Sequence, residues 1–176
     1  MTALAACTTL AACGGGGGSS DTFVGAADAS ISTTPSTIDS GDRTEVSIEL
    51  WNVHENGVML KVRFPEGLKY VRSSAILLTT DDDTDISPTI NDTSSDGDRY
   101  LVFFLSQAQF TTGGQDYSGE TGTIALQLEG VTAVSDGLIE VDPDVDDPQQ
   151  SNDAEFDIEN PEFNAQAETS ITVIGN

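Results

Sequence analysis

The sequence predicts an all-β protein, an antiparallel β-sandwich of the jelly-roll type with about eight or nine strands. Several segments alternate between apolar and polar residues with a period of two, which is the signature of half-buried strands. Turn-forming glycine, aspartate and proline separate these segments. No stretch of about ten or more residues combines the apolar period of a helix with capping residues. We therefore expect two packed sheets and no long helix.

The clearest strands lie at residues 43–51 and 58–64. Apolar and polar residues alternate in both segments, and Asn56-Gly57, a common hairpin sequence, stands between them. With residues 68–78 as a third extended segment, the pattern predicts an antiparallel meander. The residues expected to point inward are Val46, Ile48, Leu50, Val58, Leu60, Val62 and Phe64.

Further strands follow after a long polar loop at residues 79–98. Residues 100–106 are apolar on both faces, which is typical of a central strand. After a glycine-rich loop, Ile124, Leu126 and Leu128 alternate with polar neighbours. Shorter strands are expected at residues 137–141, 156–158 and 169–174.

Two runs resemble a known group of bacterial sandwich modules. VRFPEGLKYV, from Val62 to Val71, follows the first strand and turn, and GTIALQLEG extends from Gly122 to Gly130. Both resemble segments of cohesin-like and carbohydrate-binding-like β-sandwiches, and the likeness covers most of residues 28–176. The resemblance implies an extracytoplasmic role in binding or scaffolding, and it includes no catalytic motif.

The beginning of the chain resembles a bacterial lipoprotein signal. Leu10-Ala11-Ala12-Cys13 followed by glycine matches the lipobox, in which the cysteine thiol receives a diacylglycerol. A second Leu-Ala-Ala-Cys ends at Cys7, but too little apolar sequence precedes it. No lysine or arginine precedes Cys13, so we interpret residues 1–13 as a truncated signal, from a start codon placed too far downstream or from trimming.

The expected organisation is a signal, a tether and one folded domain. Residues 14–27 form a flexible tether that begins with five glycines and two serines. Residues 28–176 contain no cysteine, which excludes a disulfide or a cysteine metal cluster in the domain. The expected location is the cell envelope, with the membrane as a partner through a lipid on Cys13.

The charge of the chain limits its partners. Its 176 residues include 30 acidic and 6 basic ones, for a formal net charge of −24. Nucleic acid is excluded as a partner because its phosphates would be repelled. No run reaches the roughly 20 apolar residues that span a bilayer. An envelope protein or an extracellular polysaccharide is the expected partner.

An acidic loop at residues 142–147 is the candidate metal site. Asp142, Asp144, Asp146 and Asp147 have a spacing that brings carboxylates together around Ca²⁺, although the glycine and glutamate of an EF-hand are missing. Asp81, Asp82, Asp83 and Asp85 form a second cluster. The alternative interpretation is a solvated acidic surface. Calcium is thus the one cofactor that the sequence suggests.

Other chemistry has little support in the sequence. Trp51 lies on the face opposite Val46, Ile48 and Leu50, so it is a candidate for contact with a glycan ring. The single histidine, His54, stands in a turn without a serine nucleophile motif. We therefore expect no enzyme and no catalytic residue. The leading hypothesis is an anchored binding or scaffolding sandwich; the alternatives are a Ca²⁺-dependent adhesion or glycan-binding module and a polysaccharide hydrolase.

Overall fold

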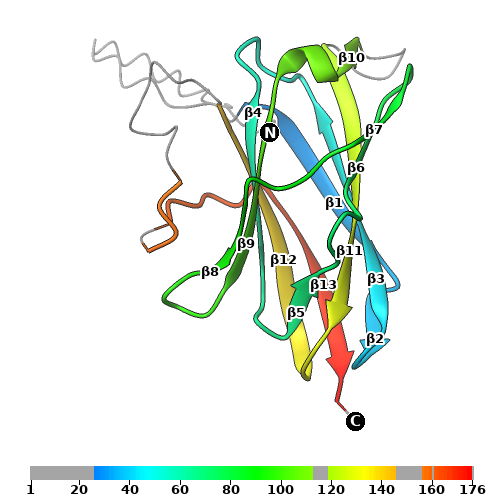
Figure 1. Ribbon diagram of the computed structural model, residues 1–176, viewed down its shortest axis with the longest axis vertical. Helices are drawn as coiled ribbons and strands as arrows, with labels where there is room; N and C mark the ends of the chain where they lie inside the picture. Colours follow the sequence, from blue (N-terminus) through cyan, green and yellow to red (C-terminus); the bar gives the residue numbers. More distant parts are fainter. Residues whose placement is uncertain (1–25, 113–118, 146–155, 160, 176) are drawn as a thin grey trace, which may run out of the picture.

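The computed structural model describes residues 26–112, 119–145, 156–159 and 161–175. In this part of the chain two β-sheets pack face to face around one apolar core (Figure 1). The predicted all-β jelly-roll sandwich is therefore confirmed. Helical structure in the described ranges amounts to the single 3-10 turn η1 (Gln107–Gln109).

The first sheet, called sheet A, is organised around one long strand. Its strands are β1 (Asp28–Thr34), β3 (Arg43–Trp51), β5 (Leu68–Tyr70), β6 (Ile76–Leu78), β7 (Asp83–Asp85), β10 (Thr111–Thr112) and β11 (Glu120–Gly130). The order across the sheet is β1–β3–β11–β6–β7, and β5 and β10 also pair with β11. All of these pairs are antiparallel.

The second sheet, sheet B, lies opposite. Its strands are β2 (Thr37–Asp39), β4 (Val58–Phe64), β8 (Ile90–Thr93), β9 (Arg99–Leu105), β12 (Val134–Val145) and β13 (Ala167–Ile174). The order is β2–β13–β12–β4–β9–β8, and only the β2–β13 pair is parallel. The two sheets contain more strands than predicted because short strands, such as β2, β5 and β7, are too brief to show an alternating pattern.

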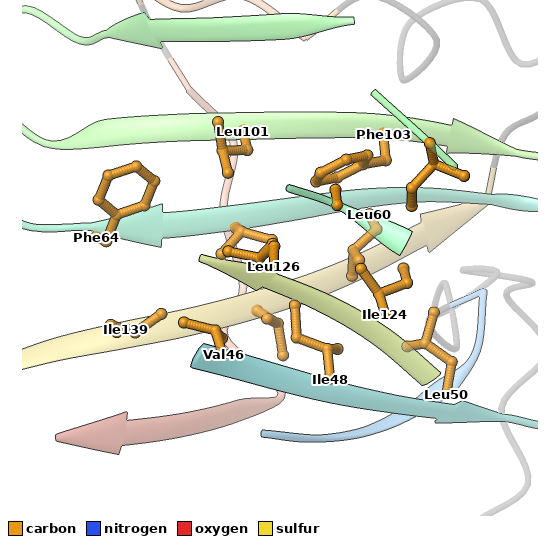
Figure 2. Close-up of a cluster of buried hydrophobic side chains, with 14 of the residues drawn as sticks. Val46, Ile48, Leu50, Leu60, Phe64, Leu101, Phe103, Ile124, Leu126 and Ile139 are labelled. Carbon is orange, nitrogen blue, oxygen red and sulfur yellow. The ribbon is translucent and has the colours of Figure 1, made fainter. Parts of the chain in front are cut away.

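The core follows the alternation of the sequence. The predicted inward residues of β3, β4 and β11 are at most 1% exposed, and Figure 2 shows side chains from both sheets meeting between them. β9 lies between β4 and β8, and Leu101 and Phe103 enter the core from one of its faces. Tyr100 and Val102, on its other face, are buried as well. The prediction of a central strand with two apolar faces is confirmed.

The predicted meander is wrong. β3 and β4 belong to different sheets, so the turn between them crosses the sandwich instead of closing a hairpin. The turn itself forms, since the Gly57 N–H donates to the carbonyl of His54 at 2.9 Å. Gly57 has φ +90, and a Cβ there would lie 2.4 Å from the carbonyl oxygen of Leu105. Glycine at this position therefore allows the backbone of the turn to lie close to that of β9, where a side chain would not fit.

The chain between β12 and β13 covers part of sheet B. We call its described residues, 156–159 and 161–166, the cover segment; it is the orange stretch beside β8, β9 and β12 in Figure 1. The structure places no strand at 156–158, so that prediction is wrong. The cover segment instead uses its side chains and a few backbone groups to contact the outer face of sheet B.

Candidate functional site

The outer face of sheet B contains a buried lysine opposite two aspartates. Lys61 lies on β4 between the core residues Leu60 and Val62, so its side chain points away from the core. Asp142 on β12 is its direct cross-strand neighbour. Asp144 is two residues further along β12 and therefore shares the same face, within reach of a long side chain.

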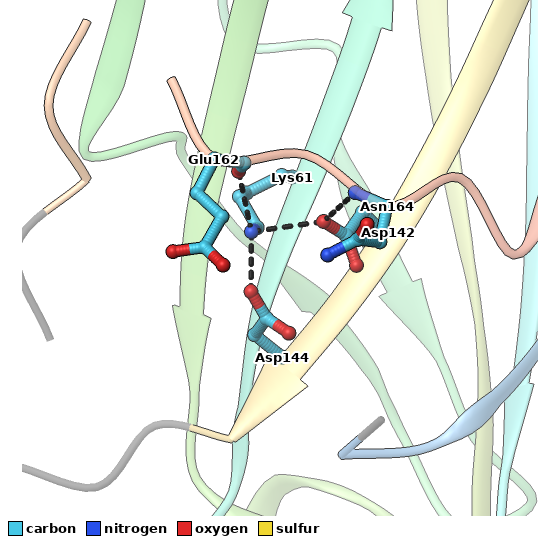
Figure 3. Close-up of polar contacts among 5 residues, drawn as sticks. All are labelled: Lys61, Asp142, Asp144, Glu162 and Asn164. Atoms are coloured by element: carbon cyan, nitrogen blue, oxygen red, sulfur yellow. Dashed lines mark hydrogen bonds and ion pairs between the residues drawn. The ribbon is translucent and has the colours of Figure 1, made fainter. Parts of the chain in front are cut away.

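The ammonium group of Lys61 is fully surrounded by acceptors. Its Nζ lies 2.9 Å from Oδ2 of Asp142, donates to Oδ2 of Asp144 and donates at 2.9 Å to the carbonyl of Glu162 (Figure 3). The side chains of Lys61 and Asp142 are each 2% exposed, and that of Asp144 is 26% exposed. All three ammonium protons thus have a partner without water.

Backbone groups of the cover segment complete the cluster. The Asn164 N–H donates to Oδ2 of Asp142 at 2.7 Å, and the Gln166 N–H donates to the carbonyl of Val141 at 2.9 Å. With the bond from Lys61 to Glu162, three hydrogen bonds join the cover segment to β4 and β12. The cluster therefore both neutralises charge and fixes the path of the chain.

Aromatic side chains shield one side of this cluster. The ring of Tyr100 on β9 lies 5.2 Å from that of Phe156 and 5.9 Å from that of Phe163, measured between centroids. The guanidinium of Arg63 lies 4.4 Å from the centroid of Phe163. Arg63 also pairs with Glu140 through two hydrogen bonds of 2.8 and 2.9 Å. These contacts cover part of the outer face of β4, where the side chain of Arg63 is still 30% exposed.

The environment changes the proton affinities of the cluster. Burial alone lowers the pKa of Lys61, but the hydrogen bonds and charges of Asp144 and Asp142 outweigh it and raise the pKa above the ordinary lysine value. Burial raises the pKa of Asp142, and the Asn164 N–H and Lys61 offset only part of that rise. A proton is therefore held more tightly than usual at both positions.

Two of the four predicted calcium ligands lie on a strand, and the other two lie outside the described residues. Asp142 and Asp144 belong to β12, so the expectation that they lie in a loop is wrong. Asp146 and Asp147 fall outside the described residues. In the described ranges no group of three or more acidic, histidine or cysteine side chains is placed to hold a metal. Because Lys61 already neutralises Asp142 and Asp144, Ca²⁺ would have to displace it there, and the calcium site stays a prediction.

The second acidic cluster lies at the edge of sheet A. Asp81, Asp82, Asp83 and Asp85 are all exposed, and the last two belong to the edge strand β7. The Asp82 side chain accepts the N–H of Asp83 at 2.9 Å, which is a local turn contact. This arrangement is that of a solvated surface segment.

Trp51 occupies the predicted position. It ends β3 on the outer face of sheet A, half-buried, with Asp28 of β1 as its cross-strand neighbour. Its contact with a glycan stays a prediction. His54 is exposed in the turn after β3, and its Nδ1 accepts the N–H of Asn56 at 3.2 Å.

Sequence reasoning missed Lys61. A lysine in an alternating strand normally points to solvent. The partners of Lys61 are also distant in the chain: Asp144 is 83 residues away and Glu162 is 101 residues away. One signal was present: Met59, on the same outer face, is apolar, which indicates that this face is covered. The alternation alone could not show that the cover comes from residues 156–166.

No family model and no curated protein matches the chain. Several solved structures share its general arrangement. AvmM, which catalyses macrocyclization in alchivemycin A biosynthesis, is similar with a TM-score of 0.46 and 12% identity over 84% of this chain and 88% of AvmM. A non-cellulosomal cohesin from Archaeoglobus fulgidus has a TM-score of 0.37 and 13% identity over 84% and 91% of the two chains.

A third solved structure is also a cohesin module. It comes from a family 33 glycoside hydrolase of Clostridium perfringens and has a TM-score of 0.36 and 7% identity, over 87% of this chain and all of that one (100%). Cohesin modules are thus among the solved structures to which this chain is similar. All three TM-scores lie below 0.5, so these likenesses carry no argument about function.

Among the described residues, no helix is long and apolar enough to cross a membrane.

Proposed function

We propose that this protein is a lipid-anchored cell-envelope β-sandwich with a non-catalytic binding or scaffolding role. The observation that carries the proposal is the order of three features: a lipobox ending at Cys13, a glycine–serine tether, and a sandwich with a closed apolar core. A lipid on Cys13 would attach the domain to a membrane, and the tether would leave its orientation free.

The geometry of the sandwich suits attachment at one end. The described chain enters beside the last residues of β12, where the Ala26 N–H donates to the carbonyl of Pro143. It leaves at the opposite end of β12, where Val173 pairs with Val134. A tether before Ala26 would therefore leave both sheet faces and the far end accessible to a partner, as Figure 1 illustrates for the described strands.

The surface of sheet A is the candidate binding face. Its outer side carries short polar side chains, the acidic Glu45, Glu49 and Glu129, and the half-buried ring of Trp51, whereas the cover segment occupies part of the outer side of sheet B. The short polar residues are Ser30, Ser32, Ser47 and Thr123. A polar and acidic surface of this kind favours a protein or polysaccharide partner over a small apolar ligand.

A non-catalytic role agrees with the chemistry of the acidic pair that faces Lys61. A hydrolase needs one free carboxylate and one carboxylic acid facing the substrate. Asp142 and Asp144 instead both contact Lys61, and Asp142 is closed off by the cover segment. The hydrolase alternative therefore has no support from this cluster.

The anchor can be tested by fractionating cells that make the protein naturally. We expect the wild-type chain in the membrane fraction, and a Cys13→Ser variant in the soluble fraction because its acyl acceptor is lost. Cys7→Ser is the matched control, since Cys7 ends the second Leu-Ala-Ala-Cys and should not matter. Recovery of wild-type chain in the soluble fraction, without lipid on Cys13, would contradict the anchor.

The binding role can be tested separately with a Trp51→Ala variant. If the outer face of sheet A binds an extracellular polysaccharide, retention of the wild-type protein on an envelope-polysaccharide matrix should fall about 5-fold or more in the variant, as expected for one lost ring contact. Leu138→Ala, an exposed apolar residue on the outer face of sheet B, is the control. Equal retention of all three proteins would exclude Trp51 as a contact.

A further inference from the structure

An amine and two carboxylates meet in a nearly water-free site on the outer face of sheet B. Nζ of Lys61 contacts Oδ2 of Asp144 and lies 2.9 Å from Oδ2 of Asp142. The strands hold these groups in register, and the cover segment closes the site with Asn164 and the carbonyl of Glu162. Fixed proximity and exclusion of water are the two conditions under which an amine condenses with a carboxyl group.

We propose that Lys61 and Asp144 form an intramolecular amide bond, an isopeptide link between β4 and β12, with Asp142 as the proton carrier. Nζ attacks Cγ of Asp144, the new N–C bond forms, and one C–O bond of the Asp144 carboxyl group breaks. The ammonium and the carboxylate together release one water molecule. The step needs no oxidant, reductant or activating cofactor. It is independent of the proposed anchoring and binding role.

The protons in this step have an identified route. The ammonium of Lys61 must lose a proton before its nitrogen can act as a nucleophile. The nearest base that is not itself attacked is Asp142, 2.9 Å away. Asp142 then delivers this proton to the oxygen that leaves Asp144. A second proton, which the nitrogen loses after its attack, follows the same route, so that the oxygen leaves as water and one hydrogen stays on the amide nitrogen. Burial raises the pKa of Asp142 and so favours the protonated form that this step requires.

The different surroundings of the two aspartates assign their roles. Asp142 is held on its other side by the Asn164 N–H at 2.7 Å and is 2% exposed, so it is fixed in place and shielded. Asp144 is 26% exposed, which gives the released water a way out. After the reaction the amide N–H that remains on the former Lys61 nitrogen can donate a hydrogen bond to Asp142, in place of the ion pair.

The test is the intact mass of the full-length chain, denatured and reduced, after expression in a bacterial cytoplasm where Cys13 receives no lipid. We expect a mass lower than calculated by one water molecule. Proteolysis should then yield one branched peptide that joins the segments containing Lys61 and Asp144. A folded chain that keeps its full calculated mass after prolonged incubation at neutral pH would overturn the proposal.

Variants separate this bond from other sources of water loss. Asp96-Gly97 and Asp136-Gly137 can lose water by forming a succinimide, but mild alkali reverses that product and leaves an amide link intact. Lys61→Arg and Asp144→Ala should both have their full calculated masses. Asp144→Asn should form the same link with loss of one ammonia instead.

Asp142→Asn tests the proton carrier, with circular dichroism to establish that the variant folds. We expect a folded protein in which the branched peptide forms at least tenfold more slowly. An unchanged rate would overturn the role of Asp142. A branched peptide joining Lys61 to Asp142 in the Asp144→Ala variant would overturn the assignment of Asp144 as the acyl group.

Discussion

Lys61 is a residue whose burial depends on every one of its neighbours. Lysine is rarely buried without a charged partner, because removing its ammonium group from water costs several kcal/mol. Here two carboxylates and the carbonyl of Glu162 replace that water. Removing the lysine would leave Asp142 buried and without its countercharge.

Relative to wild-type chain that has not formed the amide link, we therefore expect Lys61→Met to lower the free energy of unfolding by at least about 3 kcal/mol, the cost of breaking a buried pair from one side. Urea denaturation measures this directly. Lys69→Met is the matched control, because Lys69 also pairs with a carboxylate, Glu129 at 2.7 Å, but its side chain is 47% exposed. Equal effects of the two substitutions would contradict the buried cluster.

The pKa of Asp142 gives a prediction for the pH dependence of stability. Because burial raises this pKa in the folded protein, the folded state binds the proton more tightly than the unfolded state does. The wild type should therefore gain stability relative to Asp142→Asn as the pH falls from 7 toward about 3.9, the ordinary aspartate pKa. Unfolding measured for both proteins over that range checks this. A relative loss on acidification would mean that the folded pKa is lowered instead.

At the scale of elements, the alternation of apolar and polar residues correctly predicted which side chains point into the core, but it did not predict which strands pair. The inward residues of β3, β4 and β11 were predicted correctly, because a strand's own period of two reports which face meets the core. The predicted pairing of β3 with β4 was wrong, because a short turn such as residues 54–57 can join two strands of the same sheet or two strands of different sheets. Local residues determine the turn, and the distant β1 and β11 determine the partners of β3.

The site depends even more on distant residues. Asp142 and Asp144 were singled out for their spacing, but their strand position and their contact with Lys61 follow from the register of β12 on β4. Phe163 contacts Arg63, which lies 100 residues away in the chain, and Tyr100, which lies 63 residues away. Nothing in a local pattern predicts such contacts, so the chemistry of the outer face could be recognised only from the fold.

The cover segment should open before the sandwich unfolds. Phe163→Ala removes its contacts with Tyr100 and Arg63, worth about 1–2 kcal/mol together. We expect faster amide hydrogen exchange in residues 162–166 of this variant, while amides of β3 and β11 keep their protection. Faster exchange throughout both sheets would mean that the cover segment is part of the global folding unit.

At the scale of the whole molecule, the net charge makes an unfavourable electrostatic contribution to stability. A net charge of −24 repels itself in the folded state, and added salt screens that repulsion. The melting temperature should therefore rise by several degrees between low and high NaCl concentration. We expect Mg²⁺ and Ca²⁺ at equal ionic strength to act alike.

A further rise specific to Ca²⁺ would support the calcium hypothesis instead. At a hundred times its Kd, a bound ion would add about 2.7 kcal/mol to the free energy of unfolding. The rise should then disappear in an Asp144→Ala variant if Asp144 is a ligand. Its persistence there would direct attention to the exposed cluster around Asp81.

The central claim is that a buried Lys61–Asp142 pair joins the cover segment to sheet B. The most direct test is the hydrogen exchange of the Asn164 amide in the wild-type protein, measured by NMR. Its N–H donates to Asp142 at 2.7 Å, so it should exchange far more slowly than in an unstructured peptide and become fast in Lys61→Met. Exchange at the unstructured rate in the wild type would contradict the claim, because the cover segment would then not be held on the sheet.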